Sequence, residues 1–309
     1  MRPNRSTLVC LWVLAAPAFP GAEEPPPAHP LDGVILDVAS GERLNAPALA
    51  ARLAEADVVV LGEVHDNAGQ HRRQAWLMAR LDPAGVAFEM VPAERTEPLA
   101  ALAEEARDAA AWAAALPEAL DWAESGWPDW TLYRPVFEAA YGARLVGAGV
   151  ARDALSAAVR DGAAAAFGAG AERAGLAEPL PGPAQAEAVE EMRVSHCDAL
   201  PEEMLPGMVE AQRLRDARFA AAALAALEAG APAVLITGNG HARTDRGVPA
   251  YLARMAPEAR VLALGQIEVG EDAAALADDA GPDGRGLPYD FVWFSRPAER
   301  EDPCAAFAG

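Results

Sequence analysis

The sequence predicts an α/β fold, in which a mainly parallel sheet has flanking helices and an inserted helical cap. Short apolar runs with the length of buried strands alternate with longer helical segments, as they do in parallel sheets. Two of these runs span residues 58–61 and 233–236, and each ends in a glycine-containing turn. The first turn delivers His65 and the second delivers His241. In a parallel sheet both turns lie at the carboxyl edge, where open α/β folds bind their ligands.

The predicted strands begin with a hairpin. Ser40-Gly41 separates two short segments, residues 33–38 and 42–44, and this turn indicates that the segments pair. The other predicted strands are the apolar runs 58–61, 85–88, 144–146, 233–236, 261–264 and 291–294.

Two asparagines mark predicted helix starts. Asn45 is a favourable N-cap residue, and Asn67 with Gln70 has the spacing of a capping box, which opens a helix to about Leu81. The other predicted helical stretches are residues 46–56, 93–120, 153–230 and 246–255. The two longest stretches are inserted between strands, and we expect them to form the cap over the carboxyl edge.

Length and charge limit the classes of function. The 309 residues suffice for one large α/β domain or two small ones, and we expect a single domain over residues 31–300. The net charge of −21 argues against a nucleic-acid groove or binding to an anionic membrane, because phosphates require a basic patch. The same acidity also keeps an alanine-rich protein soluble.

The amino-terminal residues 1–22 resemble a cleaved secretory signal. Arg2 and Arg5 precede a short apolar run and then small residues, and the run is too short to span a membrane. Cys10 lies inside this run and not at its end, so we expect no lipid anchor. The proline-rich residues 23–30 are predicted to form a flexible tether. The chain is therefore expected to be periplasmic or secreted, with no membrane span.

Two cysteines, Cys197 and Cys304, remain after removal of the signal. In an oxidising compartment they could form a disulfide. The sequence leaves open whether they pair or stay as free thiols.

Histidines and carboxylates gather at the predicted strand ends. Glu63 and His65 follow one strand, Glu89 ends the next, and His241 follows a third. His65, Glu89 and His241 could hold a divalent metal ion. The same residues with Glu63 could instead provide a general base and its orienting carboxylate. The alternative without function is that the histidines only bond to loop backbone.

Aromatic and cationic residues could bind a flat, acidic cofactor. Trp130 and Tyr133 belong to an aromatic block with helical spacing, which either packs in the core or walls an apolar ligand site. Arg152 and Arg243 follow strand ends and could pair with carboxylates of a ligand or with acidic residues of the chain. His196 is a possible iron ligand, since histidine, thiol and tyrosine all ligate iron.

Several segments together resemble the ChaN-like haem-binding family of the Tiki/TraB superfamily. They cover about residues 57–255, and those at each end are the most specific. The matching segments are residues 61–67 with His71 and Gln74, residues 88–90, residues 130–135, residues 196–201, Gln212 with Asp216, and residues 236–249.

This resemblance implies a secreted or periplasmic protein that binds haem, has a role in iron acquisition and assembles into a homodimer. It also implies a tyrosine as haem ligand, for which Tyr133 is the candidate. Hydrolases of the wider superfamily use a Gly-x-x-His motif and a glutamate, matched here by Gly62-x-x-His65 and Glu89. The alternative function is therefore a metal-assisted or histidine-based hydrolase, and the sequence does not decide whether the chain is an enzyme.

Overall fold

The computed structural model describes residues 29–269, 286–302, 304 and 305. The predicted signal segment and most of the predicted tether lie outside the described residues. Within the described part, one mixed sheet has eight strands in the order β2-β1-β8-β7-β3-β6-β4-β5. The strands are β1 (Ile35–Asp37), β2 (Arg43–Leu44), β3 (Val58–Glu63), β4 (Gly85–Pro92), β5 (Arg144–Gly149), β6 (Ala233–Gly238), β7 (Val261–Glu268) and β8 (Phe291–Ser295).

The sheet is mainly parallel, as the sequence predicts. The six strands from β8 to β5 run parallel to their neighbours, and the antiparallel hairpin of β1 and β2 extends one edge. Because β3 and β6 are adjacent and in register, Leu61 lies opposite Ile236 and Glu63 lies opposite Gly238. The two turns that carry His65 and His241 therefore start side by side at the carboxyl edge.

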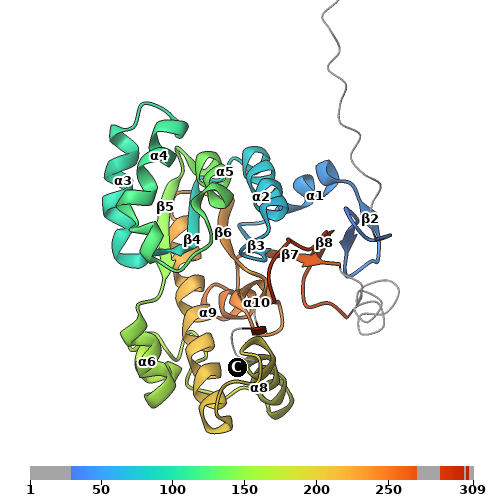
Figure 1. Cartoon of the computed structure of the whole chain (residues 1–309), viewed down its shortest axis with the longest axis vertical. Coiled ribbons are helices and arrows are strands. Elements are labelled where there is room, and N and C mark those ends of the chain that lie inside the picture. The colour runs from blue at the N-terminus through green and yellow to red at the C-terminus, as the bar shows by residue number, and fades with distance from the viewer. Residues whose placement is uncertain (1–28, 270–285, 303, 306–309) are drawn as a thin grey trace, which may run out of the picture.

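Successive side chains along each strand point to opposite faces of the sheet, and a layer of helices covers each face. Val59 and Leu61 face one layer, whereas Val58 and Val60 face the other. Figure 1 shows α2 and α5 in its upper part and the group of α6, α8 and α9 below. The first layer holds α1 (Ala46–Leu53), α2 (Ala68–Leu81), α3 (Thr96–Glu105), α4 (Ala109–Ala119) and α5 (Trp130–Ala140). The second holds α6 (Arg152–Asp161), α7 (Ala163–Phe167), α9 (Leu205–Leu227) and α11 (Val248–Met255).

The two helical insertions both reach the carboxyl edge. The first contributes the short 3-10 helices η1 (Ala93–Arg95) and η2 (Trp122–Glu124), which flank α3 and α4. The second contributes α6, α8 (Gly182–Ser195) and a third 3-10 helix, η3 (Glu202–Met204), before α9. Helix α8 is joined to the segment after β6 by ion pairs from Arg243 to Glu187 and from Arg246 to Glu191. The insertions thus reach the carboxyl edge as predicted, although α3, α4, α6, α7 and α9 also belong to the layers on the two faces of the sheet.

Two local predictions are refined by the structure. Asn67 Oδ1 accepts a hydrogen bond from the Gln70 amide at 3.1 Å, so the predicted N-cap is present. The Gln70 side chain does not complete a capping box, because its oxygen accepts from Val64 N at 2.6 Å and its nitrogen donates to Ser295 Oγ. The Gln70 side chain therefore bonds to Val64 and Ser295, and not to the backbone N–H of the N-cap residue as in a capping box.

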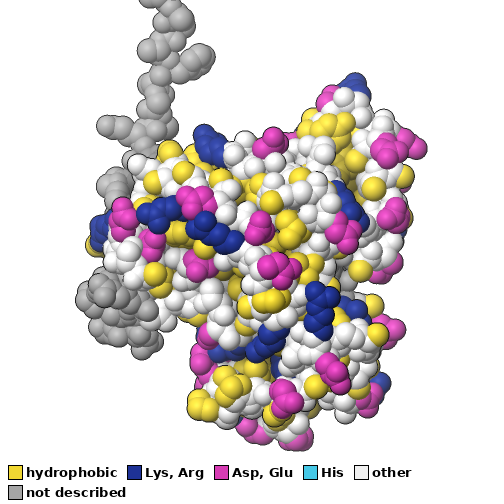
Figure 2. Space-filling view, turned by 180° about the vertical axis from the view of Figure 1, so that it is seen from behind, with side chains coloured by type: hydrophobic (Ala, Val, Ile, Leu, Met, Phe, Trp, Pro, Cys, Tyr) yellow, Lys and Arg dark blue, Asp and Glu magenta, His cyan; other side chains and the backbone are white. Residues whose placement is uncertain are grey.

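Cys197 and Cys304 form a disulfide, which answers the question that the sequence left open. Their Cα atoms are 5.4 Å apart, and the bond joins the end of α8 to the carboxy-terminal segment. On the face shown in Figure 2, acidic side chains are interspersed with arginines. Among the helices of the described residues, none has the length and apolar character required to cross a membrane.

Candidate functional site

A cavity of about 680 Å³ opens at the carboxyl edge of the sheet, beneath the inserted helices. His65 and His241 both line it, together with Glu89 from β4, which pairs with β6 on the side away from β3. Its walls also include apolar and cationic side chains from both insertions, namely Leu120, Trp127, Leu155, Phe219, Arg95, Arg152 and Arg215. We call this cavity the edge pocket.

On the face of the sheet that α2 and α5 cover, the buried carboxylate of Glu63 contacts three side chains. Glu63 Oε1 accepts a 2.6 Å hydrogen bond from the Tyr133 hydroxyl and lies 3.0 Å from His65 Nδ1. Glu63 Oε2 lies 3.1 Å from His71 Nε2, an electrostatic contact without hydrogen-bond alignment. Burial alone would raise the pKa of Glu63, but its interactions with His65 and His71 outweigh burial and lower the pKa to about 2.

His65 connects this carboxylate to the edge pocket. Its side chain is 37% exposed, and the edge of its ring meets Trp127 with the ring centroids 5.0 Å apart. Burial would lower the pKa of His65, but Glu63 and the nearby charge of Glu89 raise it to about 9. The imidazole is therefore held at Nδ1 while its other side faces the pocket.

On the opposite face, Glu89 is held by β6. Its Oε2 accepts hydrogen bonds from Thr237 Oγ1 at 2.6 Å and from Gly238 N at 2.8 Å. Its Oε1 lies 3.5 Å from His241 Nε2. Burial would raise the pKa of Glu89, but the charges of His241 and His65 and the two hydrogen bonds lower it.

Helix α9 supplies the partners of His241. Asp216 Oδ1 lies 2.7 Å from His241 Nδ1, and Gln212 Nε2 lies 3.2 Å from the same nitrogen. Burial would lower the pKa of His241, but the charges of Glu89 and Asp216 raise it. Burial raises the pKa of Asp216 to about 6. The helical spacing of Gln212 and Asp216 places both on one face of α9, and that spacing is the sequence signal for this pair.

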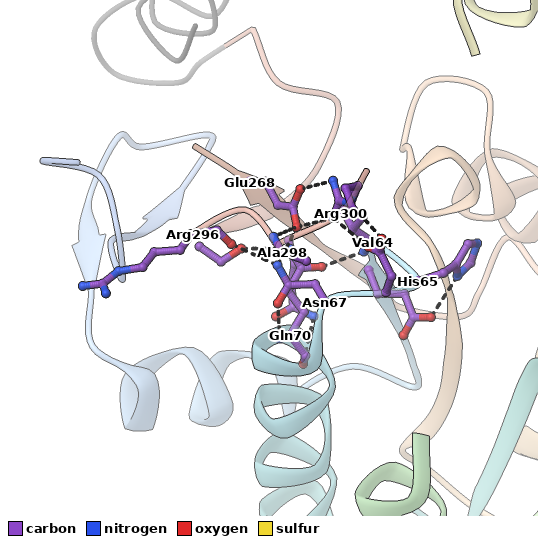
Figure 3. Close-up of polar contacts among 12 residues, drawn as sticks. Val64, His65, Asn67, Gln70, Glu268, Arg296, Ala298 and Arg300 are labelled. Carbon is purple, nitrogen blue, oxygen red and sulfur yellow. Dashed lines mark hydrogen bonds and ion pairs between the residues drawn. The ribbon is translucent and has the colours of Figure 1, made fainter. Parts of the chain in front are cut away.

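The loop that carries His65 is fixed by the carboxy-terminal segment (Figure 3). Asn67 Nδ2 donates to Glu268 Oε1 at 2.6 Å, and Ala298 N donates to the same oxygen at 2.8 Å. Arg300 forms ion pairs with both Asp66 and Glu268. These bonds hold residues 64–67 from the side away from the edge pocket, so His65 projects from a braced turn.

The other predicted binding residues have different surroundings. Arg152 begins α6 and lines the edge pocket, and its role in ligand binding stays a prediction. Arg243 does not line it, because its guanidinium pairs with Glu187 and Asp245. Arg95 and Arg215, which belong to no motif recognised in the sequence, also line the pocket, from η1 and α9.

Two predicted haem-binding aromatics pack in the core. Tyr133 is fully buried, and burial together with Glu63 raises its pKa far above the ordinary value. The ring of Trp130 packs against Trp122 and Phe137. His196 ends α8, where its ring nitrogen lies 2.8 Å from Met192 O. None of these three side chains lines the edge pocket.

The predicted metal set of His65, Glu89 and His241 is not supported. Within residues 29–269, 286–302, 304 and 305, no group of three or more histidine, cysteine or acidic side chains is arranged to hold a metal ion. A physical reason is that Glu89 and His241 are engaged with other protein groups. Thr237 and Gly238 donate to Glu89 Oε2, and Asp216 Oδ1 lies 2.7 Å from His241 Nδ1.

The sheet and its edge pocket define a ligand-binding α/β protein. A family model described as haem-binding uptake, Tiki superfamily, ChaN matches residues 49–252, and the chain belongs to this family. Among solved structures, one described as cofacial haem binding to ChaN of Campylobacter jejuni has a TM-score of 0.61 at 18% identity. That likeness covers 84% of this chain and 95% of the other, and it supports the fold.

Two further solved structures are less similar. The type III effector HopBA1 has a TM-score of 0.42 at 14% identity, covering 82% of this chain and 94% of the other. An erythromycin esterase mutant in its open conformation has a TM-score of 0.37 at 15% identity, covering 89% and 85%. Both scores are too low to carry an argument. No curated protein matches the chain.

Proposed function

We propose that this chain binds haem in the edge pocket. Haem is a flat apolar ring with an iron at its centre and two carboxylates at one edge. The observation that carries the proposal is the composition of the pocket, where a partly exposed imidazole, apolar walls and arginines surround one cavity. Its volume of about 680 Å³ lies within the range of about 300–1,000 Å³ that small-molecule sites occupy.

Each part of the pocket matches a part of the ligand. Trp127, Leu120 and Phe219 provide apolar surface for the ring. Arg152 and Arg215 can pair with the propionates, and neither guanidinium forms an ion pair with the residues that the structure describes. The exposed side chains of Glu94 and Glu124 also line the pocket. Because they would repel the propionates, they would favour the orientation of the haem in which the propionates lie near the arginines. When bound, haem would supply iron-centred redox or transport chemistry.

A hemin titration of the purified protein tests the proposal. We expect a saturable shift of the Soret band, weakened when Trp127→Ala removes an aromatic wall or Arg152→Ala removes a cation. Arg160→Ala is the matched control, because Arg160 lies on the same helix and does not line the pocket. Absence of any spectral change with the wild-type chain would refute haem binding.

We further propose that the chain is exported and takes part in iron acquisition. The signal-like segment supports export, and the disulfide is typical of oxidising compartments. Cell fractionation and growth on haem as the sole iron source test these two points separately. Cofacial haem binding, stated for the C. jejuni protein, also supports a homodimer here. Light scattering with and without haem tests the assembly.

The same geometry supports a second candidate, a hydrolase that uses histidine without a metal ion. His65 is oriented by Glu63 and faces the pocket, which is the arrangement of a general base with its orienting carboxylate. A screen of ester and amide substrates would reveal turnover. If turnover is found and survives both His65→Ala and His241→Ala, this assignment fails.

A further inference from the structure

We propose that His65 Nε2 is the atom that coordinates the haem iron, and that Glu63 is the residue that positions the imidazole. The inference rests on the proposed haem binding and departs from the tyrosine ligand that the family resemblance implies. Proteins bind haem iron through histidine, cysteine, methionine or tyrosine.

Tyrosine is excluded by burial and bonding. All four tyrosines of the chain lie in the described part, and none lines the edge pocket. Tyr133 donates to Glu63, Tyr141 donates to Ala106 O at 2.9 Å, and Tyr289 donates to Asn239 O at 3.2 Å. Tyr251 is only 2% exposed. A tyrosinate ligand would require the core around one of these rings to open.

The sulfur ligands are also poorly placed. Cys197 and Cys304 are joined in the disulfide, so neither offers a thiolate. Met90 lines the pocket but is 2% exposed, because its side chain packs in the core cluster of the α2 and α5 face. Histidine remains as the ligand type.

Among the five histidines, His65 alone combines access with a free nitrogen. His71 is fully buried against Glu63, and His241 is buried with Nδ1 against Asp216. His29 and His196 do not line the pocket. His65 is partly exposed there, and its contacts with Glu63 and Tyr133 both involve Nδ1.

A glycine lies against the edge of the His65 ring that carries Nε2. A Cβ at Gly238 would stand 3.0 Å from both Nε2 and Cε1 of His65. A larger residue at this position would therefore crowd Nε2, and glycine avoids that side chain. A metal-bound histidine commonly donates its other N–H to a carboxylate, which fixes the ring and raises its basicity. Glu63 provides such a carboxylate at 3.0 Å.

Spectroscopy of the hemin complex tests the ligand directly. In His65→Ala we expect loss of the wild-type absorption and electron paramagnetic resonance signatures, with recovery when free imidazole is added. Glu63→Gln should still bind hemin, but about 10–100-fold more weakly, as is typical when such a positioning contact is lost. It should also lower the iron–histidine stretching frequency in resonance Raman spectra of the ferrous form. Gly238→Ala should weaken coordination by filling the space beside Nε2.

Three controls separate ligation from folding and from haem binding itself. His196→Ala and Tyr141→Phe should keep the wild-type haem spectrum, because neither side chain lines the pocket or contacts Glu63, and circular dichroism should show that His65→Ala is folded. If folded His65→Ala binds hemin with an unchanged spectrum, the assignment of His65 is overturned and haem binding stands. If the wild-type chain binds no hemin, the proposed function fails and this inference fails with it. A spectrum that changes in Tyr133→Phe but not in His65→Ala would assign the iron to tyrosine.

Discussion

Glu63 Oε1 lies 3.0 Å from His65 Nδ1, and this contact reaches from the core to the edge pocket. Glu63 belongs to the face of the sheet that α2 and α5 cover, where it also meets Tyr133. Glu89 belongs to the other face and meets His241 beside α9. The edge pocket therefore receives one acid–histidine pair from each side of the same sheet.

The raised pKa of His65 makes the stability of the haem-free protein depend on pH. The pKa is about 6.5 in an ordinary setting and about 9 in the folded protein, so protonation favours the folded state. This stabilisation is fully present below about pH 6.5 and is lost as the pH rises through about 9. Urea unfolding of the wild type and His65→Gln over this range should show a stability difference that shrinks with rising pH. A difference that stays constant would contradict the assigned interaction.

Thr237→Val tests the anchoring of Glu89. The substitution keeps the side-chain shape but removes the 2.6 Å hydrogen bond to a buried carboxylate, which keeps only the amide of Gly238 as donor. Hydrogen bonds to charged groups contribute about 1.5–3 kcal/mol, so we expect the free energy of unfolding to fall by about that amount. Denaturant titration measures it. Thr131→Val removes an exposed hydrogen bond to Asp129 and should have a much smaller effect; equal losses would show that Thr237 has no special role.

Removal of the disulfide should destabilise the folded chain. Cys197 and Cys304 are 107 positions apart, so their bond restricts a long loop in the unfolded state. Loss of a native disulfide typically costs about 2–5 kcal/mol. The Cys197→Ser, Cys304→Ser double variant should therefore melt at a lower temperature than the oxidised wild type. Reductant should lower the melting temperature of the wild type alone; a similar shift in the double variant would point to a different cause.

The sequence predicted where the strands lie along the chain better than it predicted where each strand ends. Apolar runs located β3, β4 and β6, but β4 continues to Pro92 instead of ending at Phe88. Its extra length depends on Glu89, whose burial is compensated by donors from β6. Such donors lie far away in the sequence, so a local pattern does not reveal them.

The sequence likewise predicted only part of the candidate site. Strand ends correctly placed His65 and His241 at one pocket, because parallel strands in register bring equivalent turns together. The helical spacing of Trp130 and Tyr133 indicated a shared face but not what that face meets. Whether Tyr133 points to a ligand or to Glu63 depends on how α5 packs over β3, which is a tertiary property.

Gly85→Ala tests the close packing of α9 on the sheet. A Cβ at Gly85 would stand 2.2 Å from Ala226 O, and this backbone atom can move only if the helix moves. Overpacking of this kind costs about 1–3 kcal/mol, so the free energy of unfolding should fall by about that amount. Gly182→Ala is the matched control, because a Cβ there meets nothing within 4 Å at the start of α8, where alanine favours the helix. Chemical denaturation of both variants should therefore give a loss for Gly85→Ala and none for Gly182→Ala, and an unchanged Gly85→Ala would mean that α9 sits farther from β4 than the structure has it.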